Sequence, residues 1–98
     1  MTTWILDRLS TEWVGPITVT VDGNPVTGWT YTVLPHGERP ADVAAIASEP
    51  TETDDGAGIL VGPGTDHEMV RGQYRIWIRY VDDPEAPVLD GVGWIVIT

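Results

Sequence analysis

Few side chains in this 98-residue chain could do chemistry, and their spacing matches no common catalytic motif. The chain has two serines, Ser10 and Ser48, and two histidines, His36 and His67. Neither serine lies in a Gly-x-Ser-x-Gly turn, and neither histidine has the neighbours of a catalytic triad or a zinc motif. A reaction needs a nucleophile or an acid–base pair in defined geometry. We therefore expect that the protein is not an enzyme, and a small hydrolase using either histidine is the least favoured alternative.

Three acidic clusters supply oxygen atoms that a metal ion could use: 54–55, 66–68 and 82–85. Calcium needs six to eight oxygens at fixed spacing, and no segment follows the EF-hand pattern. Cysteine is absent, which excludes disulfides and thiolate metal sites. We interpret the clusters as solvated acidic loops, and we expect neither a metal nor another cofactor.

The charge balance argues against two classes of partner. Fifteen Asp and Glu residues against five Arg give a net charge of -10. Binding nucleic acid through its phosphates needs a basic face, and so does docking on an anionic membrane. The longest stretch without a charged residue, 23–37, contains two prolines and several polar residues, so it cannot span a bilayer. We expect neither a nucleic acid nor a membrane as partner.

Alternating apolar residues predict a fold built from short strands. Twelve valines, eight isoleucines and twelve threonines favour β structure. Turn signals such as Asp22–Pro25 separate the strands. The predicted strands are 17–21, 28–34, 59–61, 73–81 and 93–98, and the first two are expected to form a hairpin. A short helix is predicted over 41–48, a solvated loop over 49–58 and another loop over 82–87. The expected fold is all-β: an antiparallel β-sandwich (Ig-like) or small barrel, with at most one short helix.

The first fourteen residues are expected to form an N-terminal arm, and residues 15–98 a single domain. Spacings of three and four among Leu6, Leu9 and Trp13 would suit a helical turn, and an extended arm remains the alternative. In either case the apolar residues would form a contact with another subunit. These candidate interface residues are Trp4, Ile5, Leu6, Leu9 and Trp13.

A second candidate interface follows from the strand over 73–81. Strand alternation places Arg75, Trp77 and Arg79 on the face opposite the predicted core residues. Arg and Trp are enriched at protein–protein hot spots. Two interpretations remain open: a solvent-facing interface, or Arg stems that cover Trp77 within one chain. Exposed Trp77 or Trp13 could also stack on sugar rings, which would make the protein a carbohydrate-binding module.

Four segments together resemble small proteins encoded among the virion structural genes of tailed phages that infect actinobacteria. They are LDRLSTEWV at 6–14, ITVTVDG at 17–23, GQYRIWIR at 72–79 and DPEAPV at 83–88. The strand that begins Gly-x-Tyr also resembles the β-sandwich modules of phage baseplate proteins. The middle of the chain departs from this pattern, because residues 49–58 carry no aromatic anchor.

The resemblance implies a structural role in the virion and no catalytic residue. The expected partners are the major capsid protein or other virion subunits, in many copies. We expect an accessory or decoration protein on the capsid shell. The alternatives are a head-to-tail connector or tail accessory protein and, in a different class, the carbohydrate-binding module.

Overall fold

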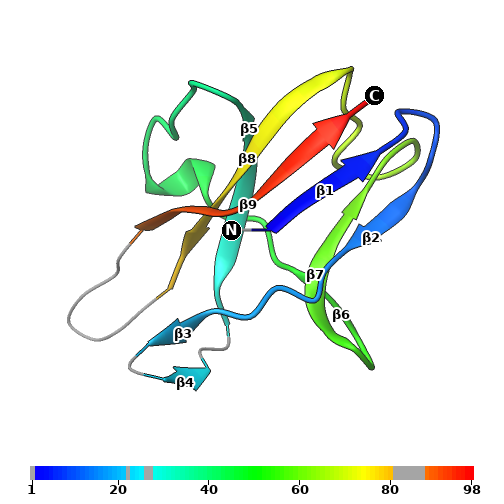
Figure 1. Cartoon of the computed structure of the whole chain (residues 1–98). Coiled ribbons are helices and arrows are strands. Elements are labelled where there is room, and N and C mark those ends of the chain that lie inside the picture. The colour runs from blue at the N-terminus through cyan, green and yellow to red at the C-terminus, as the bar shows by residue number, and fades with distance from the viewer. Residues whose placement is uncertain (1, 22, 26–27, 81–87) are drawn as a thin grey trace.

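The computed structural model describes residues 2–21, 23–25, 28–80 and 88–98. In this part of the chain the structure is nearly all β (Figure 1). One turn of 3-10 helix, η1, covers Val43–Ala45. The strands are β1 (Thr2–Leu6), β2 (Glu12–Val14), β3 (Thr20–Val21), β4 (Asn24–Pro25), β5 (Thr30–Pro35), β6 (Thr51–Thr53), β7 (Gly56–Val61), β8 (Gly72–Arg79) and β9 (Val88–Ile97).

Two sheets face each other and do not close into a barrel. The four-stranded sheet has the order β1-β9-β8-β5, and the three-stranded sheet has the order β2-β7-β6. A small ribbon, β3-β4, extends from one end (Figure 1). Among the described residues the strand pairs are antiparallel except β1–β9, which is parallel. The expected all-β, sandwich-like fold is confirmed.

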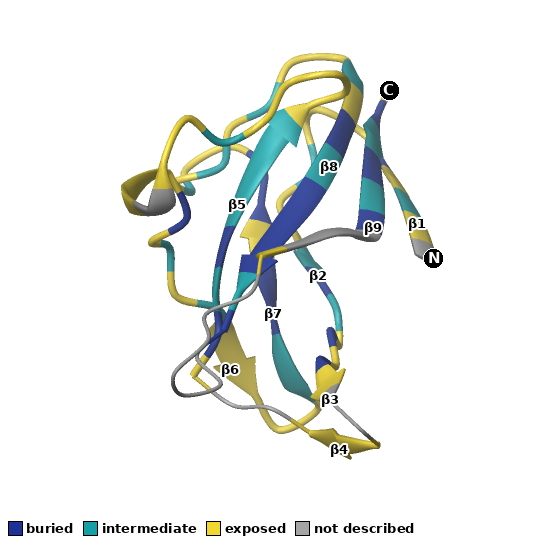
Figure 2. Ribbon diagram, turned by 90° about the vertical axis from the view of Figure 1, so that its left-hand side faces the viewer, coloured by how far each residue is buried: buried dark blue, intermediate teal, exposed yellow. Residues whose placement is uncertain are grey.

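The core lies between the two sheets, where the buried residues of β7 and β8 lie on the facing strands (Figure 2). In β8 the side chains of Tyr74, Ile76 and Ile78 join the core cluster, with Ile76 and Ile78 fully buried. The opposite sheet contributes Ile59 and Val61 from β7. The alternation predicted for β8 is therefore correct on its core side.

The predicted hairpin between 17–21 and 28–34 is wrong. Ile17 and Val19 are buried as the alternation predicts, but the chain pairs as strand only at Thr20–Val21, with Asn24–Pro25. Strand β5 pairs with β8 instead, over six residues from Thr30↔Arg79 to Pro35↔Tyr74. Alternation predicts which face of a strand is buried, but it does not specify the partner strand.

Two further predictions need correction. Residues 49–58 are not a loop throughout, because β6 and β7 form a hairpin in register Thr51↔Gly58. The two strands pair through their backbones, and all three β6 side chains are exposed. The sequence of β6 therefore has no alternating apolar pattern from which a strand could be predicted. The helix predicted over 41–48 is reduced to η1, where Asp42 Oδ1 accepts a hydrogen bond from the Ala45 N–H at 3.1 Å. The loop predicted over 82–87 lies outside the described residues.

Candidate functional site

Strand β8 does not present an open Arg-Trp-Arg row to solvent. Trp77 is only 5% exposed, and Arg75 and Arg79 are half-buried. The sequence-based expectation that this face is solvent-exposed is wrong for Trp77. A tryptophan buried to this degree cannot offer its face to a sugar ring, so the stacking hypothesis fails for Trp77 as well.

The segment between β5 and β6 covers Trp77. The Arg39 guanidinium carbon lies 5.6 Å from the centre of the Trp77 ring, close enough for a cation–π contact. Ile46, itself 3% exposed, lines the same small cavity as Trp77, together with Pro40 and Asp42. The second of the two interpretations is nearer to what is found for Trp77: an arginine covers it within the chain, through its guanidinium group, and that arginine is Arg39 rather than a neighbour in β8.

A second arginine–tryptophan stack lies beside the first. Arg75 pairs in register with Trp94 of β9, and its guanidinium carbon lies 4.4 Å from the centre of the Trp94 ring. The His36 ring packs on the same indole at 5.1 Å between ring centres. A register shift in the β8–β9 ladder between Arg75 and Trp77 separates the two stacks.

The two stacks border one hollow of about 530 Å³ on the outer face of the four-stranded sheet. We call it the outer-face pocket; its lining residues include His36, Glu38, Arg39, Arg75 and Trp77. The Trp77 indole N–H is itself buried and has no acceptor among the described residues. Of its two guanidinium groups, that of Arg39 belongs to an exposed side chain, and a guanidinium of this kind suits the recognition of a carboxylate or phosphate group.

Arg79 is not part of this pocket. Its Nε is buried without an acceptor among the described residues, and its Cα pairs with Thr30 on one side and Val88 on the other. The structure thus joins Arg75 and Trp77 to His36, Arg39 and Trp94. Sequence reasoning missed these three because they come from distant segments.

The N-terminal residues do not form a separate arm. Strand β1 pairs with β9 in the register Trp4↔Ile95 and Leu6↔Ile97, so the first and the last strand of the described chain lie side by side (Figure 1). Leu6 is 8% exposed, and Trp4 packs against the core cluster. Alternation turns Ile5 to the other face, where it is 70% exposed. The division into an arm over 1–14 and a domain over 15–98 is therefore corrected: both parts share one core.

Of the remaining predicted interface residues, one is exposed and one is half-buried. Leu9 lies in the loop that connects β1 with β2, and its side chain is 80% exposed. Trp13 lies across β7, and a Cβ added to Gly58 would come within 2.6 Å of its ring. Its Nε1–H reaches the Thr51 carbonyl oxygen of β6 at 3.5 Å. Trp13 therefore spans the outer side of the three-stranded sheet.

A tyrosine–histidine pair joins β5 to the loop after β7. Tyr31 Oη lies 2.6 Å from His67 Nε2. Burial raises the pKa of Tyr31, and the nearby Asp66 carboxylate raises it further. Burial lowers the pKa of His67, while Asp66 acts in the opposite direction. Both rings are therefore neutral at pH 7, and the contact fastens the loop to the core.

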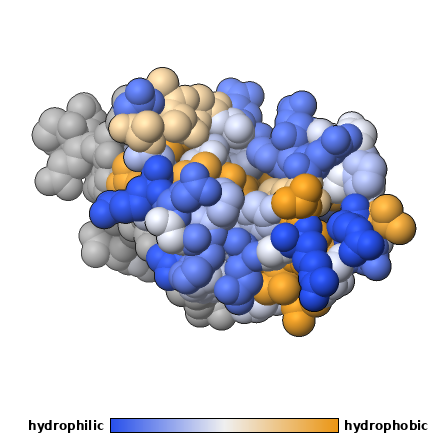
Figure 3. All heavy atoms as spheres, turned by 90° about the horizontal axis from the view of Figure 1, so that it is seen from above, coloured by the Kyte–Doolittle hydropathy of each residue, from blue (hydrophilic) through white to orange (hydrophobic). Residues whose placement is uncertain are grey.

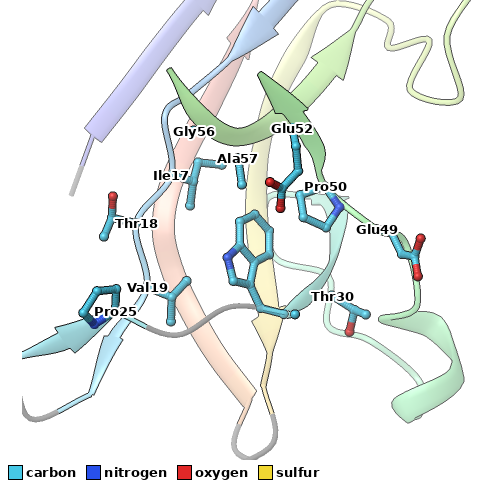
Figure 4. A pocket seen from close by; sticks show the side chains of 12 residues that line it. Ile17, Thr18, Val19, Pro25, Thr30, Glu49, Pro50, Glu52, Gly56 and Ala57 are labelled. Carbon is cyan, nitrogen blue, oxygen red and sulfur yellow. The ribbon is translucent and has the colours of Figure 1, made fainter. Parts of the chain in front are cut away.

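A further hollow of about 490 Å³ opens between the two sheets at the end near β3. Ile17, Val19 and Ala57 form part of its wall, and Trp29 also lines it. Figure 4 shows the Glu52 carboxylate directed into this hollow, whereas that of Glu49 points away. The hollow therefore has apolar side chains in its wall and one carboxylate, that of Glu52, directed into it.

Within the described ranges, no group of three or more His, Asp or Glu side chains is arranged to hold a metal ion. In the same ranges no helix has the length and apolar character needed to cross a membrane. A scan against protein-family models finds no matching family, and searches of curated proteins and of solved structures return no significant match.

Proposed function

We propose that this β-sandwich is a non-enzymatic structural protein of a tailed-phage virion, which binds the capsid shell as an accessory or decoration protein. The resemblance of segments 6–14, 17–23 and 72–79 supports the phage role. The structural support is one open strand edge, at β1, that is fit to join another subunit.

Strand β1 is the last strand of its sheet, and no described strand pairs with its other side. Hydrogen bonds between Thr98 and the backbone of Leu6 and Arg8 show which groups of β1 face β9. By alternation the N–H and C=O groups of Thr3 and Ile5 point the other way, to the unpaired side. We call these outward groups the β1 edge.

The opposite edge of the same sheet, at β5, is partly covered by another segment of the chain, in contrast to the β1 edge. Tyr31 of β5 exchanges two backbone hydrogen bonds with Ser48, at 2.9 and 3.2 Å. Thr30 Oγ1 adds a third contact by donating to the Ile46 carbonyl oxygen at 2.7 Å. Exposed strand edges are usually blocked by charge, proline or a covering segment. Residues 2–6 have neither a charge nor a proline.

Apolar side chains lie near this edge. Ile5, in the strand itself, is 70% exposed, and Leu9, shortly after the strand ends, is 80% exposed. Seen from above, the molecule carries apolar side chains among hydrophilic ones on its surface (Figure 3). Adding a partner strand at β1 would give main-chain hydrogen bonds, and the apolar groups beside it would add buried area. Many such contacts in a symmetric shell strengthen one another by avidity.

Copy number tests the location in the virion. Quantitative mass spectrometry of purified particles of the phage that encodes the chain should find it in hundreds of copies. A dozen copies or fewer would instead favour the head-to-tail connector or tail accessory role. Absence from the particles would overturn the virion proposal.

The β1 edge is tested by Thr3→Pro, which removes one outward N–H and leaves the bonds to β9 in place. We expect a folded protein that no longer enters particles, whereas Thr3→Ala enters normally. Normal occupancy by a folded Thr3→Pro protein would show that the β1 edge is not the contact.

Trp13 favours a second candidate, the carbohydrate-binding module. Its ring lies over Gly58 and is half-exposed, as a sugar-stacking platform requires. Glycan-array binding that is lost in Trp13→Ala would support this function. A blank array with the wild-type protein would count against it.

A further inference from the structure

The hollow of about 490 Å³ between the two sheets, which we call the inter-sheet hollow, lies at one end of the core. Three members of the core cluster, Ile17, Val19 and Trp29, form part of its wall. Ala57 and Pro50 also line it and are only half-buried, so apolar surface is accessible from outside. Pockets that bind small organic groups have volumes of about 300–1,000 Å³ and mostly apolar walls. The inter-sheet hollow therefore has the size and the lining of a binding site.

One carboxylate reaches the inter-sheet hollow because of the register of β6. Glu52 lies directly opposite Ala57 in the antiparallel β6–β7 pair, so the two side chains share one face of the sheet. Along β7, Ala57 alternates with Ile59 and Val61, which are fully buried, so this face is the one that looks toward the core. Figure 4 accordingly shows the Glu52 carboxylate directed into the hollow. A charged group thus occupies a core-facing position.

No cation of this chain lines the inter-sheet hollow beside Glu52. All five cations are arginines, at positions 8, 39, 71, 75 and 79, and the structure describes each of them away from this lining. The surroundings are acidic instead. Asp54 and Asp55 form the turn before Gly56, which lines the hollow, and no cation occurs between positions 49 and 58. The local potential is therefore negative and attracts a cation from outside the chain.

We propose that the inter-sheet hollow takes up an arginine or lysine side chain of another virion subunit. The Glu52 carboxylate accepts charge-assisted hydrogen bonds from the guanidinium or ammonium group. The methylene groups of the entering side chain pack on Ala57 and Pro50. The inference rests on the proposed function and deepens it, because it states the chemistry of a second contact with the shell.

Binding of a small organic cation to the full-length protein tests the site without any particle. The probe is hexylammonium, and its neutral and anionic counterparts are hexanol and hexanoate. An NMR titration followed at the Trp29 indole and Ala57 amide signals measures each dissociation constant. Glu52→Gln removes the charge. Glu49→Gln is the matched control, because Glu49 is also exposed and lines the hollow, but its carboxylate points away from it.

We expect hexylammonium to bind with a dissociation constant of about 1–10 mM, in the range of weak contacts, and more tightly than hexanol or hexanoate. Glu52→Gln should weaken this binding by about fivefold, the upper end for an exposed ion pair, and Glu49→Gln by less than about twofold. Thermal melting checks that both variants are folded.

Three results of this titration would overturn the inference: no binding of hexylammonium, equal binding of all three probes, or unchanged binding by a folded Glu52→Gln protein. Strand β6 is the last strand of its sheet, and an inward-pointing charge is one way to protect such an edge from pairing. Protection of the β6 edge would then be the role that remains for Glu52.

Incorporation into virus particles identifies the source of the cation. Glu52→Lys should prevent incorporation, whereas Glu49→Lys should leave the copy number unchanged. Normal incorporation of a folded Glu52→Lys protein would overturn the assignment to a virion subunit, and so would equal losses in both variants. Absence of the wild-type protein from particles, with hexylammonium binding intact, would overturn the virion role and leave a cation site without a virion partner.

Discussion

Arg39 and Trp77 are 38 positions apart in sequence, yet the Arg39 guanidinium lies 5.6 Å from the centre of the Trp77 ring. This contact covers Trp77 on the outer face of β8, which is the face that alternation alone would leave open. It makes Trp77 part of a second, smaller packed layer that also includes Ile46.

Replacing Trp77 tests this layer. Trp77→Ala should lower the free energy of unfolding by about 3–5 kcal/mol, as expected for a buried tryptophan. Arg39→Ala should cost only about 0.5–1 kcal/mol, because it removes one exposed cation–π contact. Chemical denaturation of the purified protein measures both. A loss below 0.5 kcal/mol for Trp77→Ala, about the limit for most surface substitutions, would show that Trp77 is exposed in solution.

Neighbouring residues in β1 should respond very differently to truncation. Trp4→Ala should cost about 3 kcal/mol, at the low end for tryptophan because this side chain is only partly buried. Ile5→Ala should change stability by no more than about 0.5 kcal/mol, since Ile5 is 70% exposed. Urea titration distinguishes the cases. Equal, small effects would mean that residues 2–6 form a loose arm after all.

Gly93 should be coupled to Trp4. A Cβ at Gly93 would collide with the Trp4 ring, and the three nearest atoms all belong to the side chains of Trp4 and Ile76. Gly93→Ala should therefore cost about 1–3 kcal/mol by overpacking. Combining it with Trp4→Leu should cost less than the sum of the two single changes. Strictly additive losses in a double-mutant cycle would rule out this contact.

The Tyr31–His67 pair predicts a pH dependence. Because burial holds the His67 pKa below its ordinary 6.5, the unfolded chain binds more protons than the folded chain as the pH falls through this value. The stability from His67 is full above pH 6.5 and is lost as the pH drops from 6.5 toward the folded pKa.

His67→Gln, which does not titrate, should lose less stability over this window than the wild-type protein does. Tyr31→Phe should cost about 1 kcal/mol at pH 7 through the lost hydrogen bond. Thermal melts between pH 7.5 and 5 supply the comparison. Parallel pH profiles for wild type and His67→Gln would show that His67 is not buried.

The alternation of apolar residues within individual strands was sufficient to predict much of the fold. Tyr74, Ile76 and Ile78 alternate in β8, and period-two spacing requires that such residues share one face. The same reasoning correctly predicted the burial of Ile17 and Val19. It gave no hint of β6, because Thr51–Thr53 bury no side chain and pair with β7 through their backbone.

The sequence by itself determined that the chain is an acidic all-β protein, because strand alternation and composition are local properties. Only the tertiary structure decided which strands pair and which faces remain open. Trp4 is fixed by β9 at the other end of the chain, and Trp77 is covered by a segment from between β5 and β6. Such contacts depend on how the sheets are assembled in space. No local pattern carries that information. The candidate interaction surfaces in the structure are therefore the β1 edge and the inter-sheet hollow, in place of an N-terminal arm and an exposed row of Arg75, Trp77 and Arg79.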